Sequence, residues 1–381
     1  MKNKTGIYIH VPFCPRKCAY CDFFSRPLKD KSILDQYAQA LQKEIQMYKT
    51  VSGPVKIQSV YWGGGTPSLL DTDKVSAIMV QLRRQFVFAD DTEITMEFNP
   101  ESGQRHRLRR FAEAGINRVS LGAQSFFDDD LKLLGRVHNS RLVYRVIENI
   151  HAAGIKNFNI DLIFGIPGQT ITSWEANLQK AVSSAPSHIS AYLLQLEESV
   201  PMYKRIEQGE YRLPDDDSAA DLYALTRERL NSCNFVQYEI SNFARPGKEC
   251  KHNILYWRAG DYQGFGAGAV SLESSRRLRV VQSAEDYIGA LAADKKPDVD
   301  ILEEMNEAEK AAEALILGLR LCEGIYIDEF NRRFNTNLIH DYAGIIKRYE
   351  DENLLHCEKG RLYLDPRAYF ISNYILADFL S

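Results

Sequence analysis

Residues 14–21 read Cys-Pro-Arg-Lys-Cys-Ala-Tyr-Cys, and this C-x3-C-x2-C spacing places the thiols of Cys14, Cys18 and Cys21 on one short loop after the apolar run Ile7–Phe13. Thiolates bind zinc, copper(I) or iron–sulfur clusters. Structural zinc takes four ligands, and the sequence has no second C-x2-C pair to complete such a site. Three cysteines on a four-iron cluster leave one iron open for an exchangeable ligand. The spacing favours this cluster, with zinc and merely reactive thiols as the alternatives.

Beyond this loop, apolar runs of strand type alternate with stretches of helical periodicity through about the first 200 residues. This alternation predicts βα units and a parallel sheet. Right-handed units of this kind curl into a barrel, with functional residues at the carboxyl ends of the strands. The predicted fold class is therefore α/β, with a partial (β/α)6 barrel. Its strands are expected at Ile7–Phe13, Ile57–Trp62, Glu93–Phe98, Arg118–Gly122, Phe158–Phe164 and His188–Leu196.

Helices are predicted between these strands. One spans residues 34–48 after an expected N-cap at Ser32, and another spans residues 75–86 after an Asp- and Thr-rich start. Gly115 and Gly154 are each expected to end a later helix in the left-handed conformation, which glycine adopts without steric penalty.

We expect three parts along the chain. Residues 1–245 form the partial barrel, residues 246–305 a connecting region, and residues 306–381 a smaller, α-rich, winged-helix-like C-terminal domain. The last part is predicted to hold three helices, at Glu307–Leu321, Ile327–Phe334 and His340–Glu352, followed by a two-stranded wing at Leu354–Leu364.

Composition excludes several classes of function. The chain has 381 residues, with 47 Lys and Arg against 51 Asp and Glu, so no global field draws it to nucleic acid. No apolar run reaches the roughly 18 residues of a transmembrane helix, and residues 1–12 lack the features of a secretory signal. The other four cysteines are scattered, which is unlike a disulfide framework. We therefore expect a cytoplasmic protein without a transmembrane segment or a nucleic-acid partner.

Polar residues and glycines mark the ends of the predicted strands. The second strand ends in Tyr61-Trp-Gly-Gly-Gly-Thr-Pro67, where glycines allow a ligand close to the backbone, and the absence of a lysine excludes a P-loop. Glu97, Gln124 and Asp161 lie at or just beyond the ends of other strands. Buried polar groups need partners, so these residues either bond one another inside the barrel or contact a ligand.

The cysteine motif with Tyr20 before its last cysteine resembles the radical S-adenosylmethionine (SAM) enzymes. The resemblance implies a 4Fe-4S cluster on the three cysteines, whose open iron chelates the amino and carboxylate groups of SAM. The further motifs resemble the coproporphyrinogen dehydrogenase (HemN-like) branch of that superfamily. By this resemblance the SAM contacts are Tyr8, Tyr20, Gly64, Gly65, Thr66, Glu97, Gln124, Arg136 and Asp161.

Two features separate this chain from the oxidases of that branch. Those enzymes carry a further cysteine where this chain has Phe23, and they have a longer segment before the residue that matches Tyr8. The C-x3-C-x2-C-x-F form and the segment His252-Asn-Ile-Leu-Tyr-Trp257 instead resemble the HemW family of heme chaperones.

That resemblance implies a protein that binds heme reversibly and passes it to heme-accepting proteins, with a homodimer as one possibility. Heme would contact His252, Asn253, Tyr256 and Trp257, since an imidazole can ligate iron and aromatic rings can flank a porphyrin. Without the resemblance, a core histidine packed among aromatic rings is the simpler interpretation. The alternative function is an oxygen-independent coproporphyrinogen III oxidase that uses a 5′-deoxyadenosyl radical formed from SAM.

Overall fold

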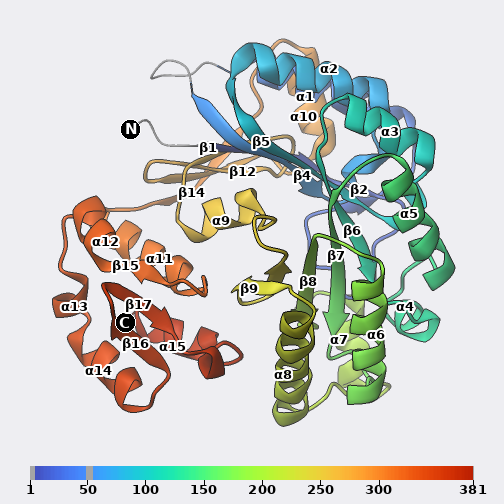
Figure 1. Ribbon diagram of the computed structural model, residues 1–381. Coiled ribbons are helices and arrows are strands. Elements are labelled where there is room, and N and C mark those ends of the chain that lie inside the picture. Colours follow the sequence, from blue (N-terminus) through green and yellow to red (C-terminus); the bar gives the residue numbers. More distant parts are fainter. Residues whose placement is uncertain (1–4, 49–54, 381) are drawn as a thin grey trace.

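Six parallel strands form the centre of one long sheet in the computed structural model, which describes residues 5–48 and 55–380 (Figure 1). They lie side by side in chain order, each paired in parallel with the next. Their carboxyl ends therefore lie on the same side of the sheet, and the predicted partial (β/α)6 fold is confirmed. The strands are β1 (Thr5–Val11), β4 (Lys56–Gly64), β5 (Val87–Phe98), β6 (Arg118–Gln124), β7 (Asn157–Phe164) and β8 (His188–Leu193).

Helices connect these strands and cover the outside of the sheet (Figure 1). Their apolar faces are buried against it, as the helical spacing predicts. Gly115 and Gly154 have φ values of +106° and +78°, which confirms the two left-handed helix ends. The helices are α1 (Ser32–Met47), α2 (Thr72–Gln85), α3 (Arg105–Glu113), α4 (Asp128–Leu133), α5 (Ser140–Ala152), α6 (Ile171–Ser183), α7 (Pro201–Glu207) and α8 (Asp216–Ser232).

The start of α1 differs from the prediction. Ser32 is the first residue of the helix, and Lys31 occupies the cap position without a side-chain hydrogen bond. The Asp30 carboxylate accepts a hydrogen bond from the Ser32 backbone N–H at 2.9 Å. The predicted cap at Ser32 is wrong: its hydroxyl donates to Asp30 Oδ2 at 2.5 Å instead of accepting from a helix N–H group.

The sheet continues past the six strands at both edges. On one side β8 pairs with the antiparallel strand β10 (Asn242–Ala244), which pairs with β9 (Val236–Glu239). On the other side β11 (Tyr262–Phe265) pairs in parallel with β1. Three antiparallel strands follow it, namely β12 (Val270–Glu273), β13 (Arg276–Val280) and β14 (Val299–Glu304). Residues 246–305, expected as a connecting region, therefore contribute these four strands to the sheet and also form α9 (Lys251–Trp257) and α10 (Ala284–Ala292).

The C-terminal region is α-rich with a small sheet, as expected. The wing has three strands rather than two, in the order β15-β17-β16. The predicted helix over His340–Glu352 is interrupted at Tyr342. The elements are α11 (Glu307–Leu319), β15 (Ile325–Tyr326), α12 (Ile327–Phe334), α13 (Leu338–Asp341), α14 (Ala343–Asp351), β16 (Leu355–Glu358), β17 (Arg361–Leu364) and α15 (Ser372–Asp378). Among all described residues, no helix is long and apolar enough to span a bilayer.

Candidate functional site

A cavity of about 350 Å³ opens at the carboxyl ends of the central strands. A parallel βα barrel places its functional residues at these strand ends. The structure brings to its wall every predicted cluster and SAM residue except Tyr8 and Thr66, namely Cys14, Cys18, Tyr20, Cys21, Gly64, Gly65, Glu97, Gln124, Arg136 and Asp161.

The cysteine loop is fixed to the barrel by backbone bonds. Cys14 lies in the short strand β2 (Phe13–Cys14), which pairs with β3 (Arg26–Pro27). The backbone N–H of Thr66 donates to the Phe13 carbonyl at 2.7 Å, directly below the loop. A side chain at Gly65 would place its Cβ 2.5 Å from that same oxygen. The glycine run is therefore required for the close packing of the cysteine loop on the end of β4.

Two polar side chains reach the cysteine sulfurs. Thr66 Oγ1 donates to Cys14 Sγ at 3.5 Å, and Arg136 Nη1 donates to Cys18 Sγ at 3.4 Å. Burial raises the pKa of Cys14, and it raises the pKa of Cys21 to about 11. A bound metal cation would lower both pKa values and favour the thiolate forms.

The three cysteine thiols share one loop and one cavity wall. Within the part of the chain that the structure describes, no three His, Cys, Asp or Glu side chains converge on a point that could hold one metal ion. In a four-iron cluster each cysteine binds a different iron, so the thiols need not converge.

Arg136 and Asn99 join the loop to the barrel. Arg136 donates to Asn99 Oδ1 at 2.7 Å and to the Gly122 carbonyl at 2.9 Å, and Asn99 Nδ2 donates to Thr66 Oγ1 at 2.6 Å. Thr66 is 1% exposed and supports Cys14 instead of facing the cavity. We did not predict Asn99, although it directly follows the strand that carries Glu97.

Two buried carboxyl groups face the cavity. The Tyr61 hydroxyl donates to Glu97 at 2.8 Å, and burial raises the Glu97 pKa to about 8. Asp161 accepts from Ser120 at 3.1 Å and from Asn159 at 2.7 Å, and burial raises its pKa as well. Such groups favour a ligand that brings a positive charge or hydroxyl donors.

Gln124 presents a free acceptor at the cavity. Its side-chain oxygen is buried without a hydrogen-bond partner, and its backbone has a φ of +64° where the pairing of β6 with β7 shifts register. A buried unsatisfied polar group costs about 1–3 kcal/mol, which a ligand donor can offset. The wall thus fits SAM, which has an amino group, a sulfonium charge and ribose hydroxyls.

Tyr8 lies one layer behind this wall. Its ring stacks on Tyr61, with centroids 6.4 Å apart, and its hydroxyl and His10 Nδ1 are 2.9 Å apart. His10 Nε2 is 2.9 Å from the Phe24 carbonyl, so both of its ring nitrogens have partners. Tyr8 is not among the residues that line the cavity, and its direct contact with SAM stays a prediction.

The predicted heme histidine is enclosed. His252, on α9, is 1% exposed, with Ser59 Oγ 2.9 Å from its Nδ1 and the Tyr256 hydroxyl 2.9 Å from its Nε2. Burial lowers its pKa to about 3. In this conformation both ring nitrogens of His252 have hydrogen-bond partners, and its contact with heme stays a prediction. Trp257 lies in a separate cavity beside the C-terminal domain, so the motif does not form one surface.

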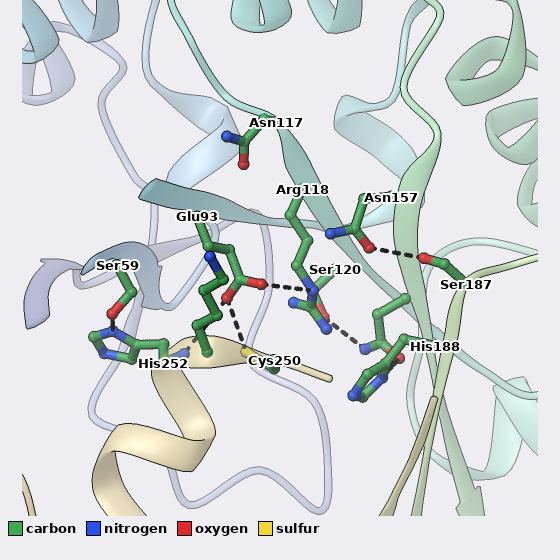
Figure 2. A network of polar contacts seen from close by, with 12 residues as sticks. Ser59, Glu93, Asn117, Arg118, Ser120, Asn157, Ser187, His188, Cys250 and His252 are labelled. Carbon is green, nitrogen blue, oxygen red and sulfur yellow. Dashed lines mark hydrogen bonds and ion pairs between the residues drawn. The ribbon is translucent and has the colours of Figure 1, made fainter. Parts of the chain in front are cut away.

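A buried polar network fills the barrel between these two regions (Figure 2). Arg118, 2% exposed, is 3.9 Å from the Glu93 carboxylate, and Cys250 Sγ donates to Glu93 at 3.4 Å. His188 Nδ1 lies 2.7 Å from Asn159 Oδ1. We did not predict this network. The sequence pattern that could have predicted it is a polar residue at every second position of adjacent strands, because such residues all lie on the inner face of the sheet. These residues are Arg118, Ser120, Asn159, Asp161, His188 and Ser190.

Known proteins resemble both halves of the chain. The Radical SAM superfamily model matches residues 8–181, and the HemN C-terminal domain model matches residues 305–371. Heme chaperone HemW of Bacillus subtilis is 32% identical over 98% of each chain, and that of Lactococcus lactis is 30% identical over 100% of this chain and 98% of its own. HemW of Escherichia coli is 36% identical over 73% of each chain.

Among solved structures, coproporphyrinogen III oxidase (HemN) of Escherichia coli superposes with a TM-score of 0.84. The match covers 99% of this chain and 90% of that one at 20% identity, so it establishes the fold alone.

Proposed function

Because this chain belongs to the HemW family of the radical SAM superfamily, we propose that it is a heme chaperone that binds heme reversibly and delivers it to acceptor hemoproteins. The observation that carries the proposal is the similarity to HemW chaperones, which extends over nearly the full length of both chains. The oxidase alternative has weaker support, since the oxidase shares the fold at 20% identity.

Phe23 supports a carrier over an oxidase. Its ring is 66% exposed and lines the mouth of the cavity beside the cysteines. The related oxidases have a cysteine at this position by the resemblance described above. An exposed phenyl ring offers an apolar contact but no thiol chemistry.

The cavity is proposed to hold a 4Fe-4S cluster on Cys14, Cys18 and Cys21, with SAM on the open iron. A cluster with SAM supplies one-electron chemistry when both are bound. Around them, Arg136 donates to the Cys18 sulfur, while Gln124 and Asp161 line the cavity and are proposed to bind the ribose hydroxyls.

Glu97 and the glycine run lie on the side of the cavity expected for the SAM amino group. The side chain of Glu97 and the backbone of Gly64 both line the wall there. A protonated amino group would favour the ionised form of Glu97, whose pKa burial otherwise raises.

Heme is the cargo in this proposal, and His252 is its proposed axial ligand. Ligation requires the enclosed imidazole to become exposed and to lose either its Ser59 or its Tyr256 partner; the lost hydrogen bond alone costs about 1 kcal/mol. An iron–nitrogen bond replaces it. Asn253 and Tyr256 lie on the same short helix and would move with His252.

We also propose that the protein works in the cytoplasm, which is a reducing compartment. The cysteines among the described residues are all free, and three of them are needed as thiolates for the cluster.

An anaerobic heme titration of the reconstituted protein tests this function, with visible absorbance as the readout. Wild type should bind heme saturably, and His252→Ala should bind more weakly and with a shifted Soret band. His106→Ala, a change at an exposed histidine on α3, is the matched control and should bind as wild type. Equal binding by wild type and His252→Ala removes His252 from the carrier site, and no saturable binding by wild type contradicts the chaperone function.

A further inference from the structure

Gln124 has an unfavourable backbone conformation at the end of β6. Its φ is +64°, in the left-handed region that residues other than glycine seldom adopt. The backbone N–H of Ser125 donates to the Ala123 carbonyl at 2.8 Å, which closes a three-residue γ-turn around Gln124. Such a conformation costs free energy and persists where neighbouring groups enforce it. The groups that enforce this turn therefore control where the Gln124 side chain lies.

A buried histidine holds the carbonyl at the start of this turn. His138 is 5% exposed, and its Nε2 lies 3.2 Å from the Ala123 oxygen. Because a carbonyl only accepts hydrogen bonds, Nε2 must carry the hydrogen. The Glu101 carboxylate lies 3.3 Å from Nδ1, the other ring nitrogen. The imidazole is thus fixed between the turn and a carboxylate, and it is not among the residues that line the cavity.

The preceding carbonyl is held from the same loop, between α4 and α5. Arg136, two residues before His138, donates to the Gly122 carbonyl at 2.9 Å. Both carbonyls lie where the pairing of β6 with β7 shifts register, between Leu121 and Gln124. The loop that carries Arg136 and His138 therefore fixes the end of β6 where this strand departs from regular sheet pairing.

The residue after the turn is anchored separately. Ser125 is fully buried, and its hydroxyl accepts from Asn177 Nδ2 at 2.9 Å and donates to Asp130 at 2.6 Å. These bonds fix Ser125 but leave the carbonyl at the start of the turn untouched. Within the described residues, His138 is the one side chain that donates to that carbonyl.

We propose that His138 is a positioning residue for SAM binding, which acts through Gln124. The inference rests on the proposed SAM site. Gln124 lines the cavity, and its side-chain oxygen is buried without a partner, so the conformation of the turn decides whether this oxygen meets a ribose hydroxyl. When the bond from His138 is lost, the turn relaxes and the Gln124 oxygen moves away from the ligand. His138 itself does not touch SAM.

Equilibrium SAM binding to the reconstituted protein, arranged as a double-mutant cycle, tests this role. His138→Phe keeps a ring but removes the donor, and it should weaken SAM binding about fivefold, the effect of one hydrogen bond. In a Gln124→Ala background the same change should cause no further loss, because the group through which His138 acts is gone. His138→Gln keeps an N–H donor and should retain most of the affinity. His106→Phe, at an exposed histidine on α3, is the matched control.

Hydrogen exchange of the protein without SAM supplies a second readout. His138→Phe should speed exchange of the Ser125 amide, because its acceptor is the carbonyl that His138 holds. The cluster absorbance should equal that of wild type. If circular dichroism shows that His138→Phe is not folded, His138→Asn replaces it, since this amide is too short to reach the carbonyl.

The outcomes separate this inference from the site on which it rests. Wild-type SAM affinity in His138→Phe, or unchanged exchange of the Ser125 amide, overturns the positioning role. An equal loss in both backgrounds also overturns it, because the effect then does not pass through Gln124. Wild-type SAM affinity in Gln124→Ala removes Gln124 from the proposed site and the inference with it. Failure of wild type to bind SAM contradicts the SAM site itself.

Discussion

The imidazole of His252 stacks on the ring of Tyr61, with centroids 5.2 Å apart and planes 24° apart, and the Tyr61 hydroxyl donates to Glu97 on the cavity wall. Tyr61 is thus the partition between the proposed heme ligand and the proposed SAM site. Tyr61 contacts both His252 and Glu97, so a displacement of either side chain changes a contact of Tyr61.

Tyr61→Phe should weaken SAM binding a few-fold, through loss of one hydrogen bond worth about 1 kcal/mol. The Tyr61 hydroxyl lowers the Glu97 pKa against the effect of burial, so its removal raises that pKa and disfavours the charged form that an amino group needs. Equilibrium SAM binding to the reconstituted protein at pH 7 measures the change. Tyr374→Phe, at a side chain that is 80% exposed, is the control. Identical SAM affinity in Tyr61→Phe and the control would contradict a role for this bond.

Replacement of Cys14, Cys18 or Cys21 by Ala should abolish the broad brown absorption of the reconstituted cluster. Each thiolate is proposed to hold a separate iron, so none can substitute for another. Iron content and visible absorbance check this, with Cys233→Ala as the control outside the cavity. Retention of a full cluster in any of the three variants argues against that cysteine as a ligand.

Gln124→Ala and Asp161→Ala should each weaken SAM binding about tenfold, which corresponds to about 1.4 kcal/mol, and spare the cluster. Both side chains line the cavity without contact to a cysteine sulfur in the described structure. SAM affinity and cluster absorbance are measured on the same samples, with the exposed Gln179→Ala as control. Unchanged SAM affinity in both variants would make these residues structural.

The buried carboxyl of Glu44 predicts a pH dependence of stability. Its Oε2 accepts from the Tyr287 hydroxyl at 2.7 Å and from the Gly266 backbone N–H at 2.8 Å, and burial raises its pKa from 4.5 to about 7. Between these pH values the folded state binds more protons than the unfolded state, so stability falls as the pH rises.

Glu44→Gln keeps the acceptor oxygen and removes this titration. Wild type should therefore lose about 3 kcal/mol more unfolding free energy than Glu44→Gln between pH 4.5 and pH 7.5. Urea unfolding at the two pH values measures the difference. Parallel pH profiles for the two proteins would show that Glu44 does not change its proton affinity on folding.

The central sheet was predictable because apolar residues recur along each core strand, and turn or helical segments separate the strands. The strands β12 to β14 were not, since Arg276–Val280 reads Arg-Arg-Leu-Arg-Val and its arginines pair with acidic residues of β14. Such edge strands depend on partners far away in the chain and lack a strong local pattern.

The cavity at the ends of the central strands was largely predictable, because parallel strands bring their carboxyl ends to the same side of a sheet wherever they lie in the sequence. The enclosure of His252 was not. Its Nδ1 partner, Ser59, is 193 residues away in the sequence, and no local sequence pattern around either residue predicts the contact. For the same reason the local motif could not reveal that Trp257 lines a cavity while His252 is enclosed.

Heme transfer tests the central claim most directly. Heme-loaded protein is mixed anaerobically with apomyoglobin, and the Soret band of the acceptor is followed; a parallel sample receives coproporphyrinogen III, SAM and a reductant. The account predicts that heme moves to the acceptor and that coproporphyrinogen III is not decarboxylated. Heme that stays on the protein, or decarboxylation in the parallel sample, would contradict the chaperone function.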